Sequence, residues 1–273
     1  MIVRARAKDA EENYRKIGGG SPIVHWSTLQ GAGLVERLRA RGHDAEYALA
    51  MRYWNPDSDA ALDRLEAAGV DRLLALTLYP HYSTATTGSS LAELKRVMKR
   101  RRTRLPLDEI DRWFGHPGYI EAIARRTRAA LEAFPVGRRP TLLVSAHGLP
   151  KHFIDEGDPY CAHIQATLSG VLGRLPELPF VLGYQSRVGP VEWIGPSTGE
   201  VIDRLAGQGV KDVLVLPISF VSDHIETLYE VDMLYADQAA RRGIVNFRRV
   251  DSLNDFPPFL DALAGLVERR LSA

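Results

Sequence analysis

Residues 202–223 read IDRLAGQGVKDVLVLPISFVSD, and this stretch decides the fold class. The run from Val213 to Ser219 is apolar at nearly every position, which is typical of a strand that helices cover on both faces. The segment before it has helical spacing of apolar residues and stops at Gly209. A helix that leads directly into a buried strand is the unit from which α/β proteins with parallel sheets are built.

The same pattern occurs earlier in the chain, where residue 62 aligns with residue 202. Residues 62–83, LDRLEAAGVDRLLALTLYPHYS, again place the letters DRL in a helix, then a Gly-Val stop, then an apolar strand. Repetition over this length indicates a duplicated α/β unit, with chance similarity between two helix–strand units as the alternative. We therefore predict two similar halves, residues 1–137 and residues 138–273.

Other stretches continue the alternation of strands and helices. The predicted strands are Ala45–Met51, Arg72–Leu78, Thr141–Ala146, Phe180–Tyr184 and Val213–Ser219. The predicted helices, besides a charged one that Gly18–Gly20 stops, are Thr28–Arg41, Ala60–Ala68, Ser90–Arg101, Gly118–Ala133, Ala162–Leu172, Gly199–Gly207, Glu226–Ala240 and Phe256–Leu271. Ligands bind at the carboxyl ends of parallel strands. We therefore expect two Rossmann-like domains with parallel sheets around a central cleft.

The composition excludes several classes of protein. A net charge of +1 gives no global field for nucleic acid or an anionic membrane. No stretch of about 18 apolar residues is present that would span a membrane. Cys161 is the sole cysteine, so this chain alone holds no disulfide framework, zinc–cysteine site or iron–sulfur cluster. This composition suits a reducing cytoplasm.

The predicted strand that ends in LLVSAHGLP, residues 142–150, carries a candidate catalytic residue. His147 follows a fully apolar run and precedes Gly148, which indicates a tight turn. A general base or a metal ligand needs this placement, with a rigid strand behind it and open space ahead. The alternative is a core histidine whose ring nitrogens bind backbone groups.

The segment SDHIETLYEVD, residues 222–232, supplies a second set of candidates. On a helix that begins here, Asp223, Glu226 and Glu230 would share one face, with His224 beside them. Carboxylates at a helix N-terminus stay ionised, which suits a cation site. The alternative is a capping box, with Asp223 as N-cap and Glu226 as its partner.

Two further stretches follow predicted strands. YPHYSTATTGSS (79–90) suits either a pocket wall around Tyr82 or a turn that caps a helix. YQSRVGPVEWIGPST (184–198) suits either a rim that holds Trp193 against a ligand or a structured connector. No GxGxxG or P-loop motif is present, so dinucleotide and nucleoside triphosphate binding lack their motifs.

Taken together, YRKIGGGSPI, YPHYSTATTGSS, SAHGLP, DPYCAHI, YQSRVGPVEWIGPST and PISFVSDHIETLYEVD occur in the order seen in ferrochelatases. Those enzymes insert ferrous iron into a porphyrin to make haem. The chain resembles the bacterial members of this family from about residue 11 to about residue 265. The resemblance implies two similar chelatase-type domains around a porphyrin cleft, which agrees with the repeat.

The resemblance also implies roles for individual residues. Fe²⁺ and protoporphyrin IX, or a related porphyrin, would be the substrates, with no tightly bound cofactor. The implied metal and catalytic residues are His147 and Glu226. The implied metal or proton path is Asp223, His224 and Glu230. The implied porphyrin contacts are Ser21, Tyr82, Trp193 and Arg6.

The chain departs from the family pattern at two places. Family members usually begin with a further segment that supplies a first strand and a lip over the porphyrin, and we expect the first half here to lack both. Some relatives bind a [2Fe–2S] cluster, but Thr84 occupies one of the cysteine positions, so no iron–sulfur cluster is expected. An apolar haem product is compatible with peripheral membrane contact, although the composition does not require it.

Two other functions stay open at this point. One is a chelatase for another tetrapyrrole or another metal, although the helix SDHIETLYE together with QSRVGPVEW favours iron and a protoporphyrin-type ring. The other is a porphyrin-binding protein without catalytic activity. Steady turnover with porphyrin in excess separates an enzyme from a stoichiometric binder.

Overall fold

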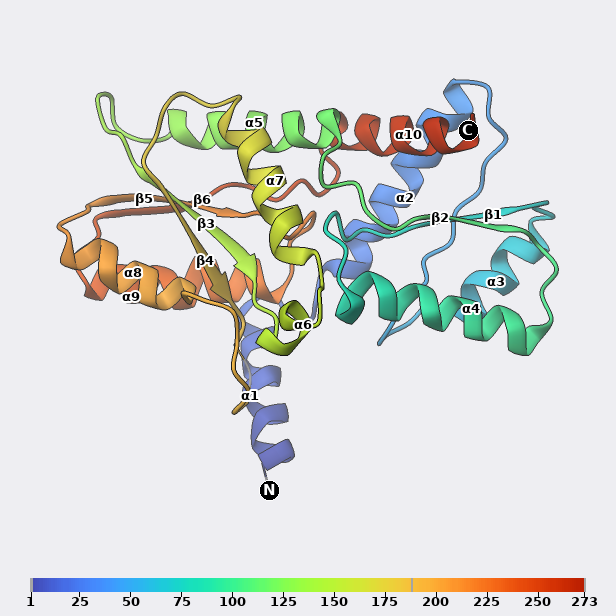
Figure 1. The fold of residues 1–273 in the computed structure, drawn as a ribbon, viewed down its shortest axis with the longest axis horizontal. Coiled ribbons are helices and arrows are strands. Elements are labelled where there is room, and N and C mark those ends of the chain that lie inside the picture. The colour runs from blue at the N-terminus through green and yellow to red at the C-terminus, as the bar shows by residue number, and fades with distance from the viewer. Residues whose placement is uncertain (1, 188, 273) are drawn as a thin grey trace. The chain divides into compact units, whose positions relative to one another are not determined.

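The computed structural model describes the backbone of residues 2–187 and 189–272, and the side chains from residue 9 onward (Figure 1). The helices are α1 (Ile2–Lys16), α2 (Ile23–Ala40), α3 (Ser58–Ala67), η1 (Thr84–Gly88), α4 (Ser89–Arg101), α5 (Pro117–Glu132), α6 (Lys151–Asp155), α7 (Tyr160–Leu172), α8 (Thr198–Gly207), η2 (Glu226–Tyr235), α9 (Ala236–Arg241) and α10 (Pro257–Leu271), where η marks a π-helix. The strands are β1 (Leu73–Leu76), β2 (Leu107–Ile110), β3 (Thr141–His147), β4 (Phe180–Gln185), β5 (Asp212–Pro217) and β6 (Asn246–Arg249). Every strand pair of these two sheets is parallel, which confirms the predicted α/β class.

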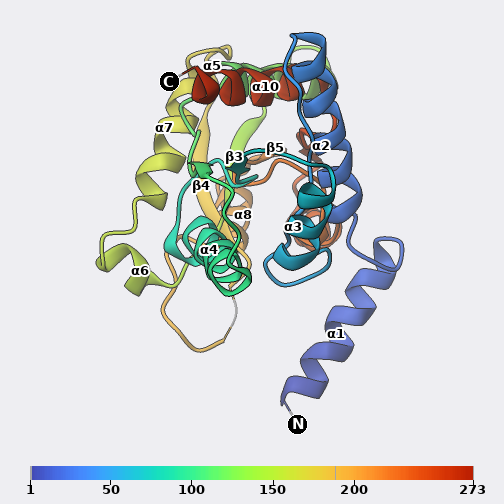
Figure 2. The ribbon, with the colours of Figure 1, turned by 90° about the vertical axis from the view of Figure 1, so that its right-hand side faces the viewer.

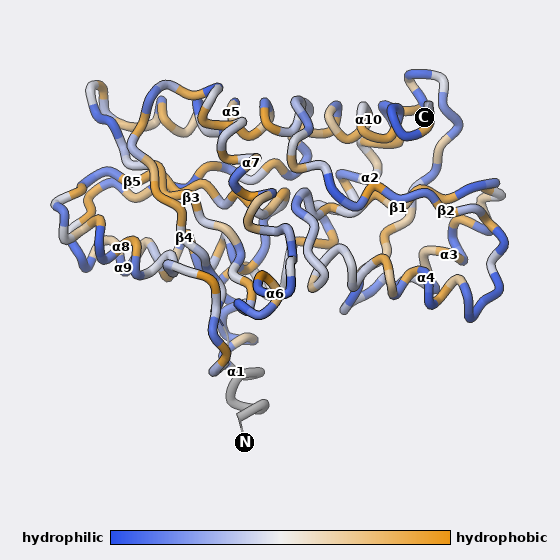
Figure 3. The backbone as a smooth tube through the Cα atoms, in the orientation of Figure 1, coloured by the Kyte–Doolittle hydropathy of each residue, from blue (hydrophilic) through white to orange (hydrophobic). Residues whose placement is uncertain are grey.

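The described chain divides into two compact units. Unit 1 consists of residues up to Trp26, Ile123–His152 and Val171–Leu253, and it contains the four-stranded sheet β4-β3-β5-β6. Both inner strands of this sheet are buried along almost their whole length because helices cover them. Figure 3 shows β3 and β5 as hydrophobic stretches between more polar connections.

One face of the unit 1 sheet packs against α8, η2 and α9. Leu143, Val213 and Val215 point to this face because alternate side chains of a strand lie on the same side. The helices contribute Val201, Ile202, Leu205, Val231 and Ala239 to the same core cluster. The packing fixes η2 against the sheet, and η2 carries two of the predicted site residues.

Unit 2 consists of Ser27–Ala122, Phe153–Gly170 and the residues from Asn254 onward, and its sheet has the two strands β1 and β2. α3 and α4 lie beside each other against this sheet (Figure 2). Their core cluster joins Leu62 of α3 and Val97 of α4 to Leu73 of β1. Elsewhere in the unit, Trp113 donates its indole hydrogen to the carbonyl of Thr77 at 2.8 Å.

The repeat seen in the sequence recurs in the secondary structure and extends beyond the two stretches that revealed it. α3 and α8 occupy equivalent places in the two halves, since Ser58 corresponds to Thr198. The strand register repeats with the same offset: Leu73 pairs with Leu107, and Val213 pairs with Phe247. α5 and α10 also begin at equivalent positions, Pro117 and Pro257.

The prediction of a strand over Ala45–Met51 is wrong. In unit 1, the edge strand β4 pairs with β3 alone. The described part of unit 2 has no strand beside β1 in the place that β3 takes beside β5. Residues 45–51 therefore have no neighbouring strand with which to form a ladder, despite their apolar character.

Two strands were missed by the sequence analysis. β2 has the sequence LDEI and β6 has the sequence NFRR, so neither is an apolar run. β6 is an edge strand and β2 belongs to a two-stranded sheet, so both are less covered than β3 and β5. Charged side chains are tolerated at such positions.

The compact units are built from interleaved segments. The predicted boundary between residues 137 and 138 lies inside Ile123–His152, a single segment of unit 1. The last helix of the first half, α5, continues into unit 1, whereas the last helix of the second half, α10, belongs to unit 2. The division into halves at residue 137 therefore stays a prediction about the repeat.

Candidate functional site

His147 is the last residue of β3, in the middle of the unit 1 sheet. The backbone N–H of His147 donates to Ser219 Oγ at 2.8 Å, and that of Gly148 donates to the carbonyl of Gln185 at 2.8 Å. These two bonds fix the strand end between the last residue of β4 and the segment that follows β5. The backbone bonds fix the position of His147. Its imidazole keeps 31% of its surface exposed and therefore stays accessible.

The imidazole of His147 contacts a glutamate on η2. His147 Nδ1 lies 2.7 Å from Glu226 Oε2. Burial lowers the pKa of His147, but the hydrogen bond and the charge of Glu226 outweigh burial, so the pKa is raised above its ordinary value. Burial likewise opposes ionisation of Glu226, yet His147 lowers the pKa of this carboxyl overall. The pair favours Nδ1–H directed at a carboxylate.

Glu230 lies one turn further along η2, near the same strand ends. Its Oε2 accepts a hydrogen bond from Gln185 Nε2 at 3.2 Å and lies 2.8 Å from Ser186 Oγ. Burial, followed by the charge of Glu226, raises the pKa of Glu230 to about 7. A carboxyl with this pKa can exchange a proton near neutral pH, which makes it suitable for proton transfer.

Asp223 turns away from the two glutamates. Its Oδ1 accepts hydrogen bonds from Ser252 Oγ at 2.7 Å and from Thr227 Oγ1 at 3.1 Å, and lies 3.0 Å from the guanidinium of Arg249. η2 begins at Glu226 and has no side-chain cap. The capping-box alternative is therefore wrong, because Asp223 instead anchors the segment before η2 to the segment after β6.

His224 remains beside the glutamate. Its Nε2 lies 3.8 Å from Glu226 Oε1, and its Nδ1 lies 3.1 Å from the carbonyl oxygen of Ser222. Phe220 lies between the two histidines, with edge contacts to the rings of His147 and His224 at 6.2 and 4.4 Å between centroids. Burial lowers the pKa of His224, which favours the neutral form of its imidazole.

The residues predicted to contact the porphyrin are less concentrated. Trp193 forms an isolated bridge with Pro150, three residues after His147. Ser21 accepts a hydrogen bond from the backbone N–H of Ile23 at the start of α2. Tyr82 belongs to unit 2, where the guanidinium of Arg112 lies 4.8 Å from its ring centroid. Arg6 is in α1, and its side chain lies outside the described residues.

Gln185 and Ser186, at the end of β4 and directly after it, were not predicted as site residues. Gln185 pairs with His147 across the β3–β4 ladder, so the two strands end side by side. Ser186 Oγ lies 2.6 Å from Glu226 Oε2, in addition to its contact with Glu230. The polar residues that end the apolar strand in YQSRVGP were the sequence signal for this pair. The prediction for this loop named only Trp193, which lies further along it.

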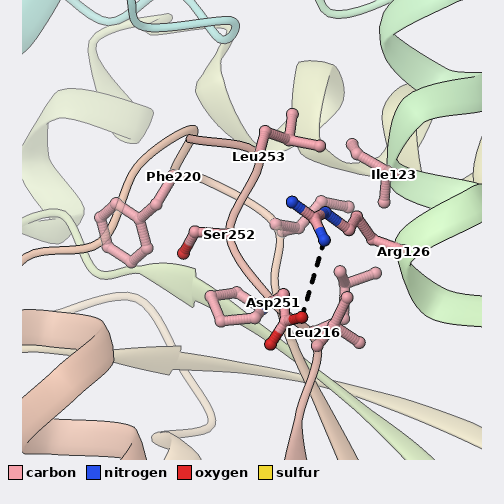
Figure 4. A pocket seen from close by; sticks show the side chains of 10 residues that line it. Ile123, Arg126, Leu216, Phe220, Asp251, Ser252 and Leu253 are labelled. Carbon is pink, nitrogen blue, oxygen red and sulfur yellow. Dashed lines mark ion pairs between the residues drawn. The ribbon is translucent and has the colours of Figure 1, made fainter. Parts of the chain in front are cut away.

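A small pocket in unit 1 borders this site (Figure 4). Its lining includes Ile123 and Arg126 of α5, Leu216 of β5, and the residue pair Phe220 and Ser252. Phe220 and Ser252 contact His147 and Asp223 respectively, but neither predicted site residue lines the pocket itself. The pocket is therefore lined by neighbours of the candidate site and not by the predicted site residues themselves.

The described residues were also compared with the requirements of a metal cluster and of a membrane-spanning helix. In the described part of the chain, no three side chains of His, Cys, Asp or Glu are arranged as a ready-made metal cluster. No helix in the same part is long and apolar enough to cross a membrane.

Gly148→Ala is expected to destabilise the protein by about 1–3 kcal/mol, because the new methyl group would overpack the strand end. An ideal Cβ at Gly148 would lie 2.8 Å from the backbone oxygen of Gln185 and 3.3 Å from the Trp193 ring. Thermal unfolding measures the effect. The matched control is Gly265→Ala in α10, where the Cβ meets open space and the helix gains stability. Equal Tm shifts in both variants would contradict the prediction.

Glu230→Gln is expected to stabilise the protein more at pH 8 than at pH 5. With a folded pKa of about 7 and an ordinary value of 4.5, the folded state holds a proton that the unfolded state has lost between these pH values. Stability therefore falls as pH rises through this window, by roughly 1–3 kcal/mol, and the amide removes that loss. Tm measured at both pH values tests this, and a constant difference between variant and wild type would contradict it.

Two solved structures of chelatases share this fold. SirB from Bacillus subtilis with Fe³⁺ matches with a TM-score of 0.64 at 12% identity, over 89% of each chain. The sirohydrochlorin chelatase SirB in complex with cobalt matches with a TM-score of 0.61 at 10% identity, over 89% of this chain and 88% of that one. Identities this low show a shared fold and no more.

Comparison with known sequences identifies the protein family. The ferrochelatase family model matches residues 1–271. The ferrochelatase of Geotalea daltonii is 48% identical over 268 residues, which cover 98% of this chain and 83% of the relative. The ferrochelatase of Synechocystis sp. is 42% identical, over 98% of this chain and 70% of the relative. The chain belongs to the ferrochelatase family.

Proposed function

We propose that this chain inserts Fe²⁺ into protoporphyrin IX or a related porphyrin, with His147 and Glu226 at the reacting centre. Family membership supports iron insertion as the reaction, and the observation that carries the site is the 2.7 Å contact between His147 Nδ1 and Glu226 Oε2. The reaction consumes Fe²⁺ and free-base porphyrin and releases metalloporphyrin and two protons. Both pyrrole N–H groups must therefore lose their hydrogens.

His147 can accept one of these protons. With Nδ1–H directed at Glu226, the neutral imidazole has its lone pair on Nε2, on the opposite side of the ring. The negative charge of Glu226 then stabilises the imidazolium that forms. Iron is a substrate that accepts nitrogen and oxygen ligands, so His147 and Glu226 can also contact it during transfer.

Glu230 and His224 would carry protons or iron to and from this pair. Glu230 shares the hydroxyl of Ser186 with Glu226, and its pKa of about 7 suits proton exchange at neutral pH. His224 lies near the other oxygen of Glu226. Asp223 would hold the segment before η2 in place, because its Oδ1 contacts Arg249, Ser252 and Thr227.

The proposed porphyrin contacts are the four residues that the family resemblance implies: Ser21, Tyr82, Trp193 and Arg6. Trp193 offers an aromatic ring beside the strand end that carries His147, which suits contact with a flat macrocycle. Ser21, Tyr82 and Arg6 offer polar groups for the propionates. A cytoplasmic location, peripheral membrane contact and the lack of an iron–sulfur cluster stay predictions.

The test is turnover under anaerobic conditions. Purified protein is mixed with Fe²⁺ or Zn²⁺ and a large excess of protoporphyrin, and metalloporphyrin formation is followed by absorbance. Product far beyond the protein concentration is expected. Conversion that stops at one equivalent would instead indicate a porphyrin-binding protein without catalytic activity.

The alternative of a chelatase for another tetrapyrrole has less support. Identities of 10–12% to SirB show the fold alone, whereas relatives at 42–48% identity are ferrochelatases. The same assay with Co²⁺ and with sirohydrochlorin measures the preference directly. We expect the highest kcat/KM with Fe²⁺ and a protoporphyrin-type ring.

A further inference from the structure

One serine lies against both glutamates of η2. Ser186 is the first residue after β4, and its Oγ lies 2.6 Å from Glu226 Oε2 and 2.8 Å from Glu230 Oε2. We propose that Ser186 is a positioning residue that holds these two carboxyl groups together beside His147. The inference rests on the proposed function, because it concerns the groups proposed to act in iron insertion.

The contacts of Ser186 with Glu226 and with Glu230 bring two acidic side chains to one hydroxyl group. Ionised carboxylates repel, so two of them do not approach a single atom without a group that links them. A serine hydroxyl can donate one hydrogen bond and accept another. It can therefore contact Glu226 and Glu230 at the same time, and it fixes the direction of both side chains.

The backbone at Ser186 supports a role for the side chain. Its φ is +66°, in the left-handed region that a Cβ atom disfavours and that glycine adopts freely. A glycine would meet the needs of the turn alone. The serine accepts this strain while its hydroxyl bridges two acidic side chains, which is the combination typical of functional sites.

Gln185 makes the bridge rigid. Its side chain is 1% exposed, and its Oε1 accepts a hydrogen bond from Ser145 Oγ at 2.6 Å. This bond sets the orientation of the amide, so Nε2 donates to the carbonyl of Glu226 at 2.9 Å and to Glu230 Oε2. The end of β4 thus holds the start of η2 through its backbone and through both carboxyl groups.

Two substitutions separate the hydroxyl from the backbone. Ser186→Gly removes the hydroxyl and relieves the left-handed strain, and Ser186→Ala removes the hydroxyl but keeps the strain. We expect kcat for Fe²⁺ insertion to fall about 10-fold to 100-fold in both, as for the loss of other groups that orient a metal-contacting residue. We expect the KM for porphyrin to stay within about twofold, and the Tm of Ser186→Gly to exceed that of Ser186→Ala, because the two variants differ only in the left-handed strain.

The control is Arg102→Gly, at another residue with positive φ, 58°, at the end of α4. It should raise the Tm without changing kcat. A Ser186→Gly enzyme with wild-type kcat would overturn the inference, and so would a loss confined to the KM for porphyrin, which would place Ser186 in porphyrin binding. Wild-type protein that forms no metalloporphyrin would refute the proposed function itself, so the two failures are distinct.

Discussion

His147→Ala is expected to lower kcat for metalloporphyrin formation about 100-fold or more, which is the usual contribution of a general base. The imidazole stands at the end of β3, where backbone hydrogen bonds fix the strand, and it is partly exposed. Its removal leaves Glu226 with Ser186 but without the base that we propose accepts the pyrrole protons. Initial rates with Fe²⁺ under anaerobic conditions measure the loss.

The control for this substitution is His152→Ala. His152 is exposed on α6, five residues after His147 and in the same unit. The control variant should keep wild-type kcat, and both variants should unfold in a single transition. Near-wild-type turnover of His147→Ala would remove His147 from the reacting centre.

Glu226→Gln is expected to lower kcat about 10-fold to 100-fold and to change the pH dependence of the rate. Glutamine keeps the shape and an acceptor for His147 Nδ1–H but loses the negative charge. That charge raises the pKa of His147, so the variant should have a lower His147 pKa. The base must be neutral to accept a proton, and the acid side of the kcat profile should therefore move to lower pH.

Two measurements check the Glu226 prediction. NMR titration of the histidine ring protons follows the pKa of His147 directly, and kcat over a pH series follows its effect on the rate. Glu177→Gln, at an exposed position of unit 1, serves as the control. An unchanged His147 pKa in Glu226→Gln would show that the contact between these two side chains has no electrostatic consequence.

The sequence predicts the buried part of this fold well, for a physical reason. Strands such as β3 and β5 are covered on both faces, and continuous burial demands continuous apolar residues. β2 and β6 escape this demand and carry charges, so they were missed. Residues 45–51 have the apolar pattern without a neighbouring strand, and a pattern alone does not provide a hydrogen-bonding partner.

In the candidate site too, some residues could be predicted from the sequence and some contacts could not. That His147 lies near Glu226 and Glu230 could be predicted, because His147 ends an apolar strand, the glutamates lie on the helix after β5, and the family resemblance groups them; their roles stay a prediction. The bridging role of Ser186 could not, because it depends on a π-helix that brings two carboxyl groups to one hydroxyl. Asp223 shares the sequence segment of Glu226 but contacts Arg249, and this pairing was missed because β6, which carries Arg249, was not predicted.

The exchange of the helices α5 and α10 has a consequence for how the chain folds. α10 comes from the second half, yet Phe259 packs against Trp113 and Asp261 pairs with Arg37, both from the first half. A cut between residues 137 and 138 would leave each fragment with a core that the other fragment completes. Neither fragment should be stable in isolation, and a mixture of the two should regain helical signal. We therefore expect the two similar halves to unfold together during denaturation, although their shared pattern suggests two independent modules.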